Sequence, residues 1–281
     1  MRFTKMHGLG NDYLYVYGEV PEHVAELSQK LSDRHFGAGS DGMIFISPSE
    51  VADFRMRIFN ADGSEAKMCG NGIRCVGKYV YDKGYTDKTG LTVETLSGIK
   101  TLTLAVAGGK VQGVSVNMGK AVAGDEMELS VGGRTVTLTP VSVGNPHAVI
   151  FVDDMETAPL TTLGPALEHH SAFPGGVNVE FVQVLSESEL RMRVWERGSG
   201  VTMACGTGAC ASVAAAVRKK YCPYNRDVSV ILDGGTLHII IADDRVGDAG
   251  QAGQAGRAGQ AGYTVTMRGP ATTVYEGETD I

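Results

Sequence analysis

The sequence lacks a long apolar run. Its first residues, Met1-Arg2-Phe3-Thr4-Lys5, lead directly into strand and loop patterns and contain no apolar core of the kind a secretory signal needs. No segment approaches the roughly 20 apolar residues of a transmembrane helix. We therefore expect neither a signal peptide nor a membrane span, and we expect a cytoplasmic location.

Cysteine and positive charge are both scarce. The chain has 5 cysteines, an odd number, and a formal net charge of −7. The odd count indicates free thiols rather than a disulfide framework. The spacings C-x5-C and C-x4-C fit structural zinc poorly, although the second touches the usual range, so zinc stays an unfavoured alternative. The negative charge argues against nucleic acid or an anionic membrane as the main partner.

What the sequence does contain is an internal repeat. Residues 54–72 read FRMRIFNADGSEAKMCGNG, and residues 190–208 read LRMRVWERGSGVTMACGTG, without a gap at an offset of 136. Each copy runs from a strand-like alternation into a turn, a cysteine, a Gly-x-Gly and a helical stretch. The repeat predicts two similar half-domains, each placing one cysteine, Cys69 or Cys205, at the start of a helix.

The rest of the chain supports two halves. Period-two alternation over residues 91–118 predicts antiparallel strands, and the second half restarts near residue 118. The segment after Cys205 is small and apolar on every side, as in a helix enclosed by a curled sheet. We predict an α/β (α+β) fold of two mostly antiparallel rolled sheets, each around a central helix. The expected domains are 1–117, completed by a strand at 270–281, and 118–269.

Residues 247–262, GDAGQAGQAGRAGQAG, interrupt this pattern. Glycine recurs every third residue, but without proline and over too short a run for a collagen helix. We interpret the segment as an insertion that extends a hairpin as an exposed flexible loop without a catalytic role.

A cysteine at a helix N-terminus has a specific chemistry. The unpaired N–H groups and the helix dipole favour thiolate over thiol, which predicts a pKa below the ordinary value of about 8.5. The same N–H groups bind carboxylates. Two such cysteines facing one substrate could remove a proton from the carbon next to a carboxylate on one face and return a proton on the other. This predicts inversion of an amino-acid centre without a cofactor.

At these residues the chain resembles diaminopimelate epimerase. The motifs that carry the resemblance are His7-Gly8-Leu9-Gly10-Asn11-Asp12-Tyr13, Phe59-Asn60-Ala61-Asp62-Gly63-Ser64, Met68-Cys69-Gly70-Asn71-Gly72, Gly144-Asn145-Pro146-His147, Trp195-Glu196-Arg197-Gly198 and Ala204-Cys205-Gly206-Thr207-Gly208. The resemblance covers the chain except for 247–262. It implies interconversion of LL- and meso-diaminopimelate for lysine and peptidoglycan precursors, with the active site in a cleft between the halves. It also implies a homodimer, with no cofactor or metal.

The resemblance further implies the roles of individual residues. Cys69 and Cys205 would be the two acid/bases, with Cys69 the donor and Cys205 the acceptor in one direction, and His147 and Glu196 would assist them. Some family members have Gln where this chain has Gly42, so one contact is absent here or comes from the backbone. The implied substrate contacts are Asn11, Asn60, Gly70, Asn71, Asn145, Asn178, Glu196, Arg197, Gly206 and Thr207.

Other interpretations stay open at this point. The leading alternative is a proline or hydroxyproline racemase of the same fold; a non-catalytic amino-acid-binding protein and a metal-dependent enzyme are further ones. His147 is equally compatible with a turn histidine, Glu196 and Arg197 with a surface ion pair, and each asparagine with a turn. We interpret the remaining cysteines as structural: Cys75, Cys210 and Cys222.

Overall fold

The structure is a computed structural model that describes residues 1–242 and 261–280. Contacts divide it into two compact units, residues 1–117 with 268–281 and residues 118–267. The chain passes from the first unit to the second within a long strand, β8 (Lys110–Ala123). Most of the insertion predicted at 247–262 lies outside the described residues, and its last two residues begin strand β17.

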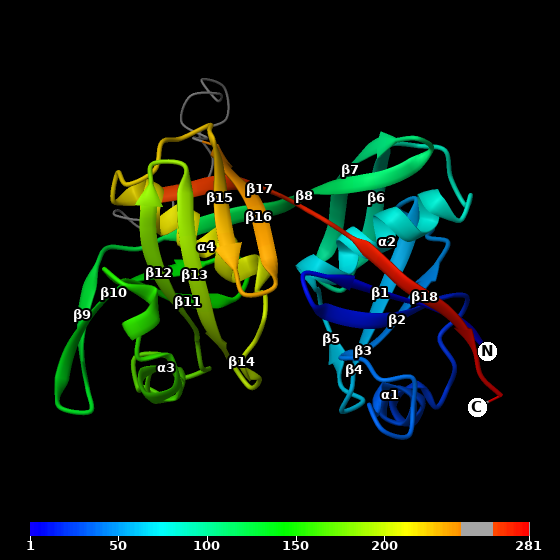
Figure 1. The fold of residues 1–281 in the computed structure, drawn as a ribbon, viewed down its shortest axis with the longest axis horizontal. Helices are drawn as coiled ribbons and strands as arrows, with labels where there is room; N and C mark the ends of the chain where they lie inside the picture. The colour runs from blue at the N-terminus through cyan, green and yellow to red at the C-terminus, as the bar shows by residue number, and fades with distance from the viewer. Residues whose placement is uncertain (243–260, 281) are drawn as a thin grey trace. The chain divides into compact units, whose positions relative to one another are not determined.

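The first unit is a sheet around a central helix, α2, with a second helix, α1, on the outside (Figure 1). Strands β1, β2 and β7 contact α2, whereas α1 packs on β3 and β4. Its elements are β1 (Arg2–Gly8), β2 (Asn11–Tyr17), α1 (Val24–Ser32), β3 (Gly42–Ser47), β4 (Phe54–Asn60), β5 (Glu65–Ala66), α2 (Gly70–Asp82), β6 (Gly90–Thr95), β7 (Gly98–Ala107), the first part of β8, and β18 (Thr272–Glu278).

The second unit repeats this plan. Helix α4 is enclosed by strands β10, β11, β12, β13, β15 and β16, and α3 packs outside on β12 and β13. Its elements are the end of β8, β9 (Met127–Val131), β10 (Arg134–Ser142), β11 (Pro146–Phe151), the 3-10 helix η1 (Met155–Thr157), α3 (Leu160–Glu168), β12 (Asn178–Ser186), β13 (Glu189–Glu196), β14 (Gly200–Val201), α4 (Gly206–Arg218), β15 (Asp227–Leu232), β16 (Gly235–Ala242) and β17 (Ala261–Gly269).

Strand pairing shows that the sequence repeat is a repeat of structure. In the first unit, β2 is parallel to β3, β3 antiparallel to β4, β4 parallel to β6, and β6 antiparallel to β7. In the second unit, β11, β12, β13, β15 and β16 follow the same sequence of parallel and antiparallel pairs. The prediction of rolled sheets around central helices is confirmed. The sheets contain more parallel strand pairs than the prediction of mostly antiparallel sheets suggests.

The residues of α4 explain why it can lie inside a sheet. Nearly all of its side chains are Ala, Val, Cys, Ser or Gly, and all of those from Gly208 to Val217 are buried. Small side chains let strands approach the helix from all sides. By contrast, α1 buries only one stripe, which includes Val24, Leu27 and Leu31, as a surface helix does.

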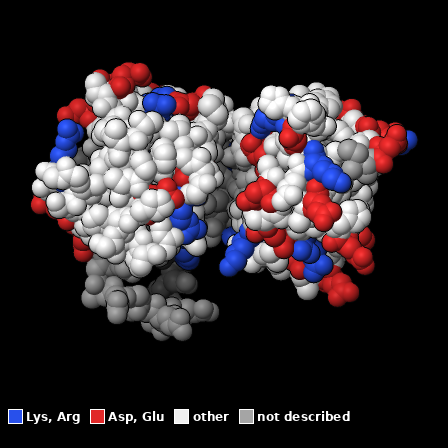
Figure 2. Space-filling model, turned by 90° about the horizontal axis from the view of Figure 1, so that it is seen from below, with Lys and Arg blue, Asp and Glu red and all other residues white. Residues whose placement is uncertain are grey.

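Charged side chains of both signs are interspersed on the face shown in Figure 2, more densely on the first unit than on the second. Lys and Arg form no continuous basic surface among the described residues of this face. No helix in the described part of the chain has the length and apolarity that crossing a membrane requires.

Candidate active site

Cys69 is the N-cap of α2, as the sequence predicts. Its backbone is extended (φ −136°, ψ 117°), and its Sγ accepts a hydrogen bond from the backbone N–H of Gly72 at 3.3 Å. The thiol also donates to Asn11 Oδ1 at 3.3 Å, and the side chain is partly exposed. Asn11 and Cys69 are therefore brought together from elements 58 positions apart in the chain.

Cys205 caps α4 with the same backbone geometry (φ −120°, ψ 110°). Its Sγ accepts a hydrogen bond from the N–H of Gly208 at 3.4 Å and lies 3.6 Å from Thr207 Oγ1. Unlike Cys69, it is only 5% exposed. The prediction that each unit presents one cysteine at the start of its central helix is confirmed.

The expectation of a lowered thiol pKa is wrong for Cys205. Burial raises its pKa well above the ordinary value, and the neighbouring carboxylates of Glu196 and Glu180 raise it further. Hydrogen bonds from Thr207 and Gly208 act in the opposite direction without outweighing these effects. These surroundings therefore favour the protonated thiol of Cys205 at neutral pH.

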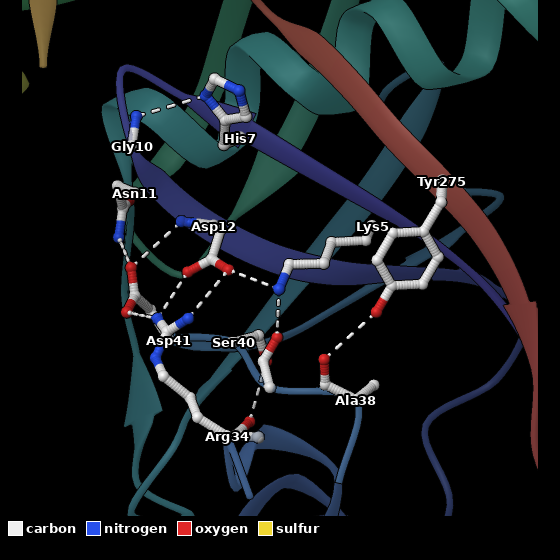
Figure 3. Close-up of polar contacts among 12 residues, drawn as sticks. Lys5, His7, Gly10, Asn11, Asp12, Arg34, Ala38, Ser40, Asp41 and Tyr275 are labelled. Atoms are coloured by element: carbon white, nitrogen blue, oxygen red, sulfur yellow. Dashed lines mark hydrogen bonds and ion pairs between the residues drawn. The ribbon is translucent and has the colours of Figure 1, made fainter.

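A charge network holds Asn11 in place in the first unit (Figure 3). Asp41 Oδ2 accepts from Asn11 Nδ2 at 2.8 Å and from the N–H of Asp12 at 3.0 Å. Arg34 bridges Asp41 and Asp12 at 2.8 Å each, and Lys5 pairs with Asp12 at 2.9 Å. With its amide nitrogen fixed by Asp41, Asn11 presents its oxygen to Cys69.

Asp12 is ionised within this network although it is only 8% exposed. Burial raises the pKa of its carboxyl, but hydrogen bonds and charge attraction from Arg34 and Lys5 together bring it below the ordinary value. The network therefore consists of two carboxylates and two cations, which balance in charge.

A hydrogen-bonded series leads to Cys205 in the second unit. His147 Nδ1 lies 2.7 Å from Glu180 Oε1, and His147 Nε2 lies 3.0 Å from Asn145 Oδ1. Asn145 Nδ2 donates to Thr207 Oγ1 at 3.3 Å. His147 is 1% exposed, so it is a core residue of β11 and not a turn histidine.

Glu196 does not form the surface ion pair with Arg197 that was an alternative. Its carboxylate accepts a hydrogen bond from Thr202 Oγ1. Burial raises the pKa of Glu196, and the Glu180 carboxylate raises it further, while hydrogen bonds from Thr202 and Cys205 lower it. Glu196 therefore lies next to the Cys205 thiol.

Asn60, Asn178 and Arg197 are each held by hydrogen bonds within their own unit, Asn60 by donating to Ser64 Oγ at 3.0 Å. Asn178 accepts from the N–H of Arg197 at 3.0 Å and donates to the Pro146 carbonyl at 3.1 Å, and the Arg197 guanidinium donates to Gly175. Gly70 and Gly206 are the first helical residues after the two cysteines.

Asn71 and Gly42 are less available for substrate contacts than their positions in the motifs suggest. Asn71 is 4% exposed and its Oδ1 accepts from the buried Arg74 at 2.9 Å, so part of its amide is used within the unit. Gly42 pairs with Asn60 across β3 and β4, and a Cβ there would lie 2.1 Å from the Phe59 carbonyl oxygen. A glutamine at position 42 thus requires a backbone shift.

Sequence reasoning missed Glu180, Asp41 and Tyr13. Glu180 stands between Val179 and Phe181 in a strand-like stretch, where a carboxylate on the buried face is out of place, and this was a usable signal. Burial raises the pKa of Tyr13 well above its ordinary value, and the nearby Cys69 contributes, so its phenol stays protonated. Nothing in the sequence marks Asp41 as the partner of Asn11.

The remaining cysteines are buried, which agrees with a structural role. Burial raises the pKa of Cys75 and of Cys222 to about 11. In the described part of the chain, no cluster of three or more His, Cys, Asp or Glu side chains is arranged to hold a metal ion.

Comparison with known proteins places the chain among epimerases. The family profile of diaminopimelate epimerase matches residues 3–123 and 139–255. The diaminopimelate epimerase of Parabacteroides distasonis is 52% identical over 281 residues, 99% of this chain and 97% of that protein. That of Acetivibrio thermocellus is 47% identical over 296 residues, 100% of this chain and 99% of that protein.

Solved structures share the fold at low identity. A Bacillus anthracis phenazine biosynthesis protein of the PhzF family has a TM-score of 0.76 at 17% identity, covering 100% of this chain and 99% of that one. A probable proline racemase of Agrobacterium radiobacter K84 has a TM-score of 0.73 at 16% identity, covering 100% and 93%. These likenesses support the fold alone.

Proposed function

The chain belongs to the diaminopimelate epimerase family, and we propose that it interconverts LL-2,6-diaminopimelate and meso-diaminopimelate, an isomerase step in lysine and peptidoglycan precursor synthesis. The observation that carries the proposal is the matched pair of cysteine caps. Cys69 and Cys205 stand at the same place in two copies of one fold, each accepting a hydrogen bond from the third residue after it.

In the proposed reaction, the two sulfurs act on the same α-carbon. One thiolate removes the α-proton, the electron pair of the C–H bond passes into the carboxylate, and the other thiol then protonates the carbon from the opposite face. In the direction in which Cys69 is the donor, Cys205 must first lose its proton. His147 and Glu196 assist this loss, through the contacts that reach Cys205 from β11 and β13.

The N-termini of α2 and α4 account for stabilisation of the charged intermediate. The first N–H groups of a helix point out of its N-terminus, and the first two positions are Gly70 and Asn71 in α2 and Gly206 and Thr207 in α4. These donors and the helix dipoles favour a carboxylate, most strongly when proton loss adds charge to it. Asn11, Asn60, Asn145, Asn178 and Arg197 supply donors for the rest of the substrate, and Glu196 an acceptor for an ammonium group.

This mechanism needs neither a metal nor an organic cofactor, because the thiols transfer the protons and the helix N-termini stabilise the negative charge on the substrate carboxylate. Treatment with EDTA is expected to leave the activity unchanged. We further propose that the protein is a cytoplasmic homodimer, as the family resemblance implies.

Incubation of the purified protein with LL-diaminopimelate in D2O tests the function. The expected result is meso product with one solvent deuterium at the inverted α-carbon, measured by NMR and mass spectrometry. L-proline and trans-4-hydroxy-L-proline are the matched controls. Exchange with either of these, and none with diaminopimelate, would replace the proposal by a proline-type racemase.

A further inference from the structure

Glu180 is a buried acidic residue at a position where the fold can also accommodate an apolar side chain. It is 0% exposed, in the middle of β12, where it is paired with Val149 on one side and Val194 on the other. The equivalent residue of the first unit, 136 positions earlier, is the buried Ile44. Burial of a carboxylate is unfavourable without a partner. Because only the second copy has a glutamate at this position, we infer that Glu180 has a role specific to the second unit.

Glu180 lies directly beneath the first turn of α4. A Cβ added to Gly208 would be 2.8 Å from Glu180 Oε1 and 3.2 Å from Cys205 Sγ. The second glycine of Cys-Gly-Thr-Gly thus leaves room for this carboxylate beside the cysteine. Glu180 Oε2 has no hydrogen-bond partner among the described residues, so the residue's polar contact is made by Oε1 with His147.

The hydrogen bonds give the series a direction. In the orientation of the structure, Asn145 Oδ1 faces His147 Nε2, and Asn145 Nδ2 donates to Thr207 Oγ1. An amide oxygen only accepts, so this orientation of the Asn145 amide requires a proton on Nε2. Thr207, which already accepts from Asn145, has its own hydroxyl proton available for Cys205 Sγ at 3.6 Å.

The direction depends on the proton count of His147. If the ring carried a proton on Nδ1 alone, Nε2 would be an acceptor and the Asn145 amide would turn to donate to it. Asn145 Oδ1 would then accept from Thr207, and the hydroxyl would no longer donate to the sulfur. The Glu180 carboxylate and the Asn145 amide oxygen can both accept hydrogen bonds from His147 only if both ring nitrogens of His147 carry a proton.

We propose that Glu180 is a positioning residue that keeps His147 protonated at both ring nitrogens, so that Asn145 and Thr207 are aligned to donate a hydrogen bond to the Cys205 thiolate. This rests on the proposed epimerase function for its catalytic consequence, because the thiolate of Cys205 is formed when that residue acts as the base. The hydrogen bond donated through Thr207 then offsets the direct effect of the Glu180 charge, which disfavours that thiolate. Glu196, on β13, is the other carboxylate facing this thiol. Glu196 accepts hydrogen bonds from Thr202 and from Cys205 itself, so it reaches the sulfur directly, whereas the series from Glu180 reaches it through Thr207.

Imidazole nitrogen NMR of the substrate-free protein tests the proton count without any turnover. With 15N-labelled histidine at pH 7, both nitrogens of His147, assigned by their loss in His147→Gln, are expected at shifts of protonated nitrogen. In Glu180→Gln one of them should move to the shift of a bare nitrogen, whereas Glu187→Gln, an exposed change in the β12–β13 turn, should leave both unchanged. A bare nitrogen in the unsubstituted protein overturns the proposal, even if Glu180→Gln fails to fold.

Kinetics test whether Glu180 acts through the series. Glu180→Gln is expected to lower kcat for diaminopimelate about 10–100-fold, by analogy with the loss of a carboxylate that supports a metal-bound histidine, with KM changed less than about threefold. Glu180→Asp, which keeps the charge, should recover part of this loss.

Thr207→Val removes the last donor, so Glu180→Gln in that background should cost much less than it does alone. Independent, multiplicative effects would overturn the proposal. If even the unsubstituted protein does not epimerise diaminopimelate, the proposed function fails, and the NMR result still decides the role of Glu180.

Discussion

At the scale of single residues, the two cysteines share a backbone and differ in surroundings. Cys69 is partly exposed, whereas Cys205 is buried with its pKa raised by burial and by Glu196 and Glu180. Because the thiolate is the nucleophile, iodoacetamide at pH 8 should alkylate Cys69 at least about 10-fold faster than Cys205. Peptide mass spectrometry over time measures both rates. Equal rates would contradict the account of Cys205 as the protonated partner.

Each cysteine should be indispensable for inversion. Cys69→Ser and Cys205→Ser are each expected to lower the epimerisation rate about 10²–10⁴-fold, because a serine hydroxyl neither gives up nor returns the proton as readily. Cys222→Ala, a change at a buried thiol with no role in the site, is the control and should keep the rate. Calorimetry should show substrate binding by both serine variants. If either variant still inverts diaminopimelate at the original rate, the two-thiol mechanism is wrong.

Asp12 should contribute to stability in a pH-dependent way. Its folded-state pKa lies below the ordinary value of 3.8, so its stabilising effect is present above that value and is lost as the pH falls through the folded-state pKa. Asp12→Asn should lower the free energy of unfolding by about 1–3 kcal/mol at pH 7. Urea denaturation should show the difference shrinking towards pH 3. An equal difference at both pH values would mean that ionisation of Asp12 is not the cause.

At the scale of elements, the start of α4 combines a cap, a glycine and a buried carboxylate. Gly208→Ala would place a methyl group 2.8 Å from Glu180 Oε1, closer than real Cβ contacts come. The first turn must shift, so kcat should fall at least about 10-fold, with a stability loss of about 1–3 kcal/mol. Gly90→Ala, where a Cβ meets nothing within 4 Å, is the matched control. An unchanged kcat in Gly208→Ala would show that the cap tolerates displacement.

The elements also show what the sequence could and could not predict. The repeat predicted both helix starts, because two copies of one sequence pattern impose one backbone and one cap geometry. The network of Asp41, Asp12, Arg34 and Lys5 could not be predicted, because it depends on which residues neighbouring strands and loops bring together. The pKa direction at Cys205 was missed for a related reason: the helix start was visible in the sequence, but the burial and the carboxylates of β12 and β13 were not.

At the scale of the whole molecule, the duplication is retained in the pairing of five strands and a central helix, and the chemistry of the two copies differs. The two units pair their strands in the same order, yet Ile44 is matched by Glu180, Asn60 by Glu196 and Asn71 by Thr207. Asn11 is anchored by charged residues in the first unit, whereas Asn145 belongs to the series from Glu180 in the second. The proposed two-thiol mechanism requires two proton carriers that differ in protonation at any moment, and the different surroundings of Cys69 and Cys205 on similar backbones are consistent with such a difference.

The proposed two-thiol mechanism predicts where deuterium appears first. If one cysteine removes the α-proton and the other delivers a solvent-derived proton, then in D2O at early times deuterium should be found in the product and not in the recovered substrate. The same should hold starting from LL- and from meso-diaminopimelate, because the cysteines exchange roles with direction. Quenched time points analysed by mass spectrometry measure both pools. Early deuterium in recovered LL-diaminopimelate would indicate that one residue both removes and returns the proton, and the second unit would then only bind.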